Sequence, residues 1–93
     1  MTENTWKLYL LRCKDGTLYC GITTDVAARL EAHRSGKGAK YTRGRGPLEL
    51  VYTEDCGDHA TALKREIAVK RLTKPQKEEL IEKWESAVLN SAK

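Results

Sequence analysis

Hydrophobic residues gather in two short runs near the start of the chain, at residues 8–11 and 18–22, separated by a Lys-Asp-Gly segment at 14–16. An Asp-Gly pair between apolar runs is a strong signal for a β-hairpin. The pattern therefore predicts two antiparallel strands, at residues 6–13 and 17–23.

The length of the hairpin turn decides which way the two tyrosines of these strands point. A two-residue turn would place Tyr9 and Tyr19 on opposite faces, because side chains alternate along a strand. A three-residue turn, with Gly16 left-handed, pairs Cys13 with Thr17 and places both tyrosines on one face. The longer turn also gathers apolar side chains on the other face: Leu8, Leu10, Leu18, Cys20 and Ile22. We therefore expect the three-residue turn, although both tyrosines are also explained as half-buried strand aromatics under a helix.

The remaining pattern predicts one more strand and three helices. A helix capped by Thr24 or Asp25 ends near residue 34, a third strand covers residues 48–53, and helices follow at 59–72 and from a capping box at 73–76 to about 88. We expect an α+β fold: a small three-stranded, mainly antiparallel sheet with helices packed on it, in the order β-β-α-β-α-α. Residues 1–93 are expected to form a single domain with frayed ends at 1–5 and 90–93.

Each predicted helix has an apolar stripe along one face, and we expect the stripe of the second helix to be buried. The stripes consist of Val26 and Leu30, then Ala60, Leu63 and Ile67, then Leu80, Ile81, Trp84 and Val88. Glu66 and Lys70 lie four residues apart beside the second stripe, which is also the spacing of an ordinary surface ion pair.

Composition fits a folded domain in a reducing compartment. Of 93 residues, 40% are hydrophobic and 32% charged, and no run is long enough to span a membrane. The first residues lack the pattern of a signal peptide, so we expect a cytoplasmic protein. The three cysteines form no Cys-x-x-Cys pair, which favours free thiols over disulfides or a zinc site.

Positive charge is concentrated in one glycine-rich loop at residues 35–47. The net charge is only +4, but residues 34–45 hold five cations and no acid. Cationic side chains around an aromatic one suit contact with nucleic acid. The candidate contacts in this loop are Lys37, Lys40, Tyr41, Arg43 and Arg45. The Gly-Lys-Gly at 36–38 lacks the rest of a Walker motif, so we expect no nucleotide or other small-molecule cofactor.

Several spacings together resemble the GIY-YIG nucleases. Lys-Leu-Tyr at 7–9 lies where that family carries Gly-Ile-Tyr, and Tyr-Cys-Gly at 19–21 matches its Tyr-Ile-Gly. Arg29 follows Tyr19 by ten residues, as the helix arginine of the family does, and Glu66 stands on a later helix where the family carries its metal-binding glutamate. Residues 21–23, 29–33 and 36–42 look most like the small, stand-alone bacterial members.

The resemblance implies an endonuclease that hydrolyses DNA phosphodiester bonds with one divalent ion, Mg²⁺ or Mn²⁺, guided by DNA structure and linked to repair or processing. In this interpretation Arg29 binds the scissile phosphate, and Glu66 holds the metal. Tyr19, Tyr9 or His33 orients or deprotonates the attacking water, and the residues leave that choice open. Gly21 and Lys70 have secondary roles.

The alternatives are a module that binds nucleic acid without cutting it, with RNA as well as DNA as a ligand, and a docking module for a protein partner. No contact with a membrane is expected. For a nuclease, Tyr9, Tyr19, Arg29, His33 and Glu66 should converge on one concave surface.

Overall fold

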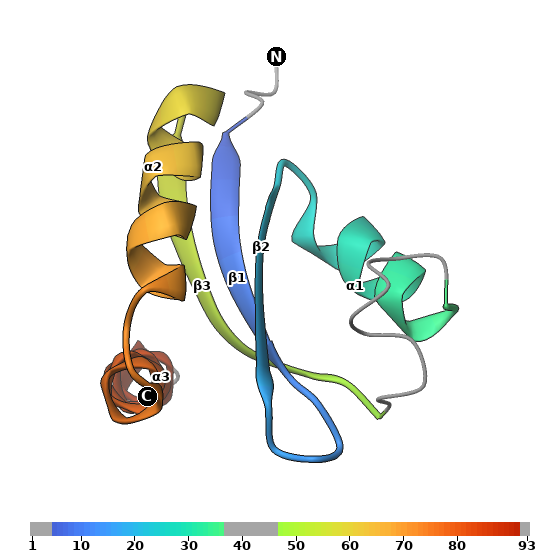
Figure 1. Ribbon diagram of the computed structural model, residues 1–93, viewed down its shortest axis with the longest axis vertical. Coiled ribbons are helices and arrows are strands. Elements are labelled where there is room, and N and C mark those ends of the chain that lie inside the picture. The colour runs from blue at the N-terminus through green and yellow to red at the C-terminus, as the bar shows by residue number, and fades with distance from the viewer. Residues whose placement is uncertain (1–4, 37–46, 92–93) are drawn as a thin grey trace.

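A computed structural model describes residues 5–36 and 47–91 of the chain (Figure 1). Its elements, in chain order, are β1 (Trp6–Arg12), β2 (Leu18–Thr23), α1 (Val26–Arg34), β3 (Glu49–Gly57), α2 (His59–Lys70) and α3 (Lys74–Ser91). The expected order and the α+β class are confirmed.

The hairpin has the three-residue turn that the apolar pattern predicts. The amide of Cys13 donates to the carbonyl of Thr17 at 2.8 Å, and the amide of Gly16 donates to the carbonyl of Cys13 at 2.9 Å. Gly16 has a φ of +86°, a conformation that L side chains rarely adopt. The resulting register pairs Tyr9 directly with Gly21.

The three strands form an antiparallel sheet in the order β2-β1-β3. The third strand is longer than the predicted 48–53, because β3 follows β1 back to its first residue, where Trp6 pairs with Gly57. A register shift between Leu10 and Leu11 leaves Val51 as an extra residue in β3. In this order β1 is central and β2 is an edge strand.

Helices cover both faces of the sheet, with α1 on one side and α2 and α3 on the other (Figure 1). Leu8, Leu10 and Cys20 belong to the core beneath α2 and α3, together with Val69 and Ile81. On the other face, a second core contains Tyr9, Leu11, Cys13 and Leu48, with Tyr19 and Leu30 packed against it. The alternation of side chains along the hairpin therefore supplies both cores.

The predicted caps begin each helix. The amide of Ala28 donates to the Asp25 carboxylate at 3.1 Å, and the amide of Thr61 donates to the Asp58 carboxylate at 2.8 Å. At the start of α3 the capping box is reciprocal, since the Thr73 amide donates to the Gln76 side chain and the Gln76 amide to the Thr73 hydroxyl.

The predicted buried stripe of α2 is wrong. Ala60 is exposed, and Leu63 and Ile67 are 40% and 52% exposed, whereas Ala62 and Val69 are completely buried. The helix is rotated about its axis relative to the apolar pattern, so that the partly buried Arg65 and Glu66 belong to its inner side. On the third stripe, Ile81 belongs to the core and Leu80 and Trp84 pack on it, whereas Val88 is 47% exposed.

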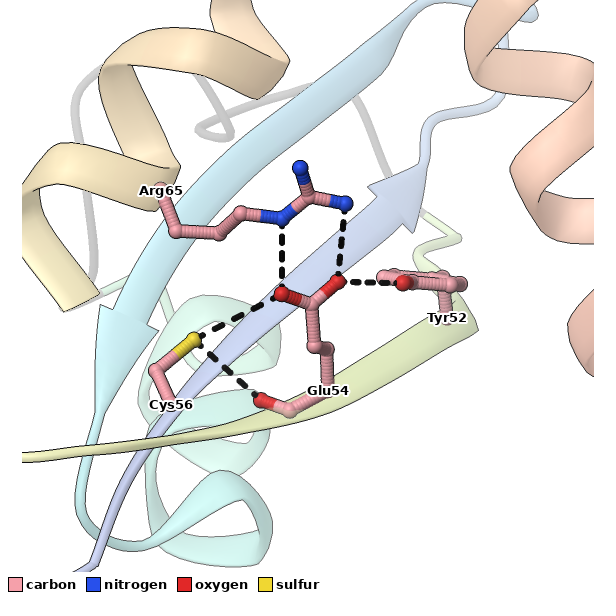
Figure 2. Close-up of polar contacts among 4 residues, drawn as sticks. All are labelled: Tyr52, Glu54, Cys56 and Arg65. Carbon is pink, nitrogen blue, oxygen red and sulfur yellow. Dashed lines mark hydrogen bonds and ion pairs between the residues drawn. The ribbon is translucent and has the colours of Figure 1, made fainter. Parts of the chain in front are cut away.

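A polar network explains the rotation of α2 (Figure 2). The Arg65 guanidinium donates to both carboxylate oxygens of Glu54 in β3, from Nε at 2.7 Å and from Nη2 at 3.1 Å. The Tyr52 hydroxyl also donates to the Glu54 carboxylate, and the Cys56 sulfur lies 3.8 Å from one oxygen of that carboxylate. Burial disfavours the charged carboxylate, but the hydrogen bonds from Arg65 and Tyr52 outweigh burial and lower the pKa of Glu54. A two-pronged bond of this kind fixes both the position and the orientation of the helix.

This network gives a stability prediction. Replacing Arg65 by Met leaves the half-buried Glu54 carboxylate without its main partner, and should lower the free energy of unfolding by about 1–3 kcal/mol. The matched control is Lys64→Met, at the preceding, exposed position of the same helix. This substitution should change the free energy of unfolding by less than about 0.5 kcal/mol. Urea denaturation of both variants measures the difference, and equal effects would contradict the role given to Arg65.

Candidate active site

Four of the predicted site residues lie together on the face of the sheet that α1 covers. Tyr9 comes from β1, Tyr19 from β2, and Arg29 and His33 from α1. The His33 ring lies 5.2 Å from the Tyr19 ring and 5.9 Å from the Tyr9 ring, between centroids, and the two tyrosine rings are 6.3 Å apart. Three of the four side chains thus form one aromatic cluster.

Gly21 makes room for this cluster. A Cβ atom at position 21 would lie 2.5 Å from the Tyr9 hydroxyl oxygen and 2.7 Å from the ring carbon that bears it. Real Cβ atoms do not approach other heavy atoms so closely, so the Tyr9 ring can lie across β2 only because its cross-strand partner is glycine.

The centre of the cluster is a buried hydrogen bond of 2.9 Å between the Tyr9 hydroxyl and Nε2 of His33. Both side chains are 2% exposed. Burial raises the pKa of Tyr9 to about 12, although a hydrogen bond from Arg29 opposes the rise. Burial also lowers the pKa of His33, and the positive charge of Arg29 lowers it further. At neutral pH the pair is therefore an uncharged phenol and an uncharged imidazole.

Arg29 supplies the positive charge of this face. It is half-buried on α1, one turn before His33, and its charge acts on both members of the buried pair. A guanidinium remains protonated and can offer two parallel donors to an oxyanion. The group can therefore bind a phosphate at the edge of the aromatic cluster.

Glu66 and Lys70 lie on the other face of the sheet, because α2 covers that face (Figure 1). Lys70 Nζ is 3.4 Å from a carboxylate oxygen of Glu66, whose side chain is only 18% exposed. The Glu66 charge acts on the Cys20 thiol, whose residue stands between Tyr19 and Gly21 in β2. The two groups of predicted residues therefore lie on opposite faces of the same edge strand, and Glu66 does not share one concave surface with the other four, in contrast to our expectation.

The remaining predicted contacts are Lys37, Lys40, Tyr41, Arg43 and Arg45, which lie outside the described residues. Within residues 5–36 and 47–91 no three His, Cys, Asp or Glu side chains are close enough together to hold a metal ion. A divalent ion at Glu66 would thus have fewer than three ligands of these types from the described residues, and would take most of its oxygens from water and substrate. Mg²⁺ commonly binds in this way beside a phosphate.

Lys77 was not among the residues predicted from the sequence. With Lys70, it lines an open cavity beside β2 that also includes Tyr19 and Cys20. Lys77 follows a helix break at residues 71–73, so no single helical period relates it to Lys70, and periodicity offers no signal for this pairing.

Comparison with known proteins finds a matching family model and relatives that are similar along most of the chain. The family model described as the GIY-YIG catalytic domain matches residues 5–79. A UPF0213 protein of Yersinia enterocolitica is 52% identical over 90 residues, which cover 97% of this chain and 93% of that protein. A UPF0213 protein of Yersinia pseudotuberculosis is 57% identical over 81 residues, covering 87% of this chain and 85% of its own length.

Two structures solved by solution NMR are similar to this fold. The UPF0213 protein of Bacillus halodurans has a TM-score of 0.55 and 49% identity, covering 84% of this chain and 83% of its own. A protein of E. faecalis has a TM-score of 0.62 and 38% identity, covering 90% of both chains. In the described part of the present chain, no helix combines the length and apolar character that a membrane crossing requires.

The close approach of Tyr9 to Gly21 gives a second prediction. Gly21→Ala forces the ring from its place and should lower the free energy of unfolding by about 1–3 kcal/mol, as overpacking does elsewhere. In a Tyr9→Leu background, which removes the hydroxyl and the ring, the same change should cost much less. Urea denaturation of the four proteins gives the coupling energy between the positions, and a value near zero would contradict this packing.

Proposed function

This chain belongs to the GIY-YIG family, and from that premise we propose that it is a metal-dependent endonuclease that hydrolyses phosphodiester bonds in DNA. The observation that carries the proposal is the cluster of Tyr9, Tyr19 and His33 with Arg29 beside it. It combines the hydroxyl group of the partly exposed Tyr19, which can contact water, with a fixed positive charge on Arg29, which can contact phosphate.

Arg29 has the role of binding the phosphate. The scissile group is an anion, and more charge collects on its oxygen atoms as the attacking water approaches. A guanidinium that is already in place stabilises this charge without reorganisation. Because Arg29 also acts on the Tyr9 hydroxyl, the phosphate should lie close to the tyrosine pair.

The state of the buried pair narrows the choice of the group that acts on water. With a pKa of about 12, Tyr9 stays protonated, and its hydroxyl is engaged with His33. His33 is buried behind that bond. Tyr19 is the partly exposed member of the cluster, and its ring meets His33 nearly edge-on, at 62°. We therefore assign to Tyr19 the contact with the attacking water, and to Tyr9 and His33 the positioning of Tyr19.

Glu66 would hold the divalent ion, Mg²⁺ or Mn²⁺, and the ion would supply positive charge for the oxygen that leaves. The Glu66 carboxylate already has a positively charged neighbour, because the ammonium group of Lys70 lies 3.4 Å from it. The scissile phosphate would then lie at the edge of β2, between Arg29 on one face and Glu66 on the other. Recognition of DNA structure rather than of base sequence, and a role in repair or processing, are part of this proposal.

Cleavage assays on nicked and branched DNA test the proposal. Glu66→Gln keeps the shape of a side chain that belongs to the inner side of α2 but removes its charge, and should abolish cleavage at every Mn²⁺ concentration. Arg29→Ala should lower the maximal rate by about 10²–10³-fold, the effect of losing one transition-state donor. It should leave unchanged the Mn²⁺ concentration that gives half of that rate.

The matched control is Glu79→Gln on α3, because Glu79 has the same i,i+4 pairing, with Lys83 at 3.9 Å, but a 65% exposed side chain. It should cleave as the wild type does. Normal cleavage by Glu66→Gln would contradict the metal role. Absence of wild-type cleavage on all substrates, combined with tight DNA binding, would instead identify a binding module on this fold.

A further inference from the structure

A cavity of about 230 Å³ lies beside β2, on the face of the sheet opposite the aromatic cluster. Its lining consists of Leu18, Tyr19, Cys20, Lys70 and Lys77. The strand contributes three consecutive residues, while α2 contributes one lysine from its last turn and α3 one from its first turn. The cavity therefore adjoins the candidate site at Tyr19 and opens along the edge of the sheet.

The charged side chains that line this cavity are lysines. Two of its five lining residues are lysines, and none is acidic. Lys70 already has Glu66 as a counter-ion at 3.4 Å. Lys77 forms no ion pair with the residues that the structure describes. Its charge is therefore less compensated than that of Lys70. Burial and the negative charge of Glu66 raise the pKa of the Cys20 thiol to about 12, and the ammonium groups of Lys70 and Lys77 act against this rise, so both lysine charges lie close to the strand.

A third lysine extends the row along the hairpin. Lys74 Nζ donates to the carbonyl of Gly16 at 2.7 Å, at the turn where β2 begins. Lys74 and Lys77 are three residues apart, so both lie on one side of the first turns of α3. Lysine side chains therefore lie along β2 from the hairpin turn to Cys20. A nucleic-acid backbone that runs parallel to β2 would place its phosphates beside them.

We propose that the cavity binds a second backbone phosphate of the nucleic acid, distinct from the phosphate at Arg29, with Lys77 as its main ligand. A compact ammonium is a common phosphate ligand, and the cavity has room for one tetrahedral group. This inference rests on the proposed function, because it assumes that a nucleic-acid strand crosses the edge of β2. Together with the phosphate contact at Arg29, this second contact would fix the direction of the nucleic-acid strand across β2.

The affinity of a fluorescent duplex oligonucleotide, measured over a series of salt concentrations with EDTA present, tests this site without cleavage. Each neutralised phosphate contributes about −0.9 to the slope of log affinity against log salt. Lys77→Gln should make the slope less steep by about 0.9, and Lys77→Arg should restore it. Lys70 is unsuitable for this test, because its loss would also leave Glu66 without its counter-ion.

The matched control is Lys83→Gln, also on α3, whose lysine is 74% exposed and lies outside the cavity lining. It should have the wild-type slope, and its thermal melting should match that of Lys77→Gln. If the two glutamine variants have the same slope, or if the wild type binds no DNA, the phosphate site is wrong. Saturable binding of inorganic phosphate at Lys77 without any effect on the oligonucleotide would also overturn it.

Cleavage by the same proteins separates the two proposals. Wild-type cleavage with identical slopes for Lys77→Gln and Lys83→Gln rejects the cavity but keeps the nuclease. A reduced slope for Lys77→Gln without cleavage in Mg²⁺ or Mn²⁺ keeps the phosphate site but rejects the nuclease.

Discussion

The register of the first hairpin is the constraint on which the rest of the structure depends. The three-residue turn at Gly16 pairs Tyr9 with Gly21 and sends both tyrosines to the face of α1. A shift of one residue would exchange the faces of one strand, because the side-chain period is two. If β2 shifted, Tyr19 would leave the aromatic cluster and face the core beneath α2 and α3. Cys20 would leave that core for the other face of the sheet. Core and candidate site are therefore fixed by the same few backbone hydrogen bonds.

The second constraint is the position of β2 at the edge of the sheet. An edge strand leaves a row of backbone groups unpaired and gives access from both faces. Arg29 and the aromatic cluster lie on one face, and Glu66 with the Lys70–Lys77 cavity on the other. Because Arg65 binds Glu54 in β3, α2 is held in the rotation that turns Glu66 inward. The proposed chemistry thus depends on an ion pair that takes no direct part in it.

Local rules predicted much of this fold from the sequence, and contacts between distant elements account for what they missed. The hairpin turn and the caps at Asp25, Asp58 and Thr73 depend on neighbouring residues, and each is present in the structure. The predicted buried side of α2 was wrong, because the apolar pattern does not show that Arg65 binds the Glu54 carboxylate on β3. For the site, spacing identified the residues that gather around Tyr9, but not the placement of Glu66 across the sheet or the part of Lys77 in the cavity.

We propose that metal and phosphate are bound at the edge of β2. Paramagnetic broadening of backbone amide signals by Mn²⁺, in the presence of a short DNA duplex with cleavage-resistant linkages, locates the ion directly. We expect strong broadening of the amide signals of Glu66 and of β2 from Tyr19 to Gly21, and no such broadening at either place in Glu66→Gln. Broadening centred on the exposed carboxylates of α3, or unchanged broadening in Glu66→Gln, would contradict it.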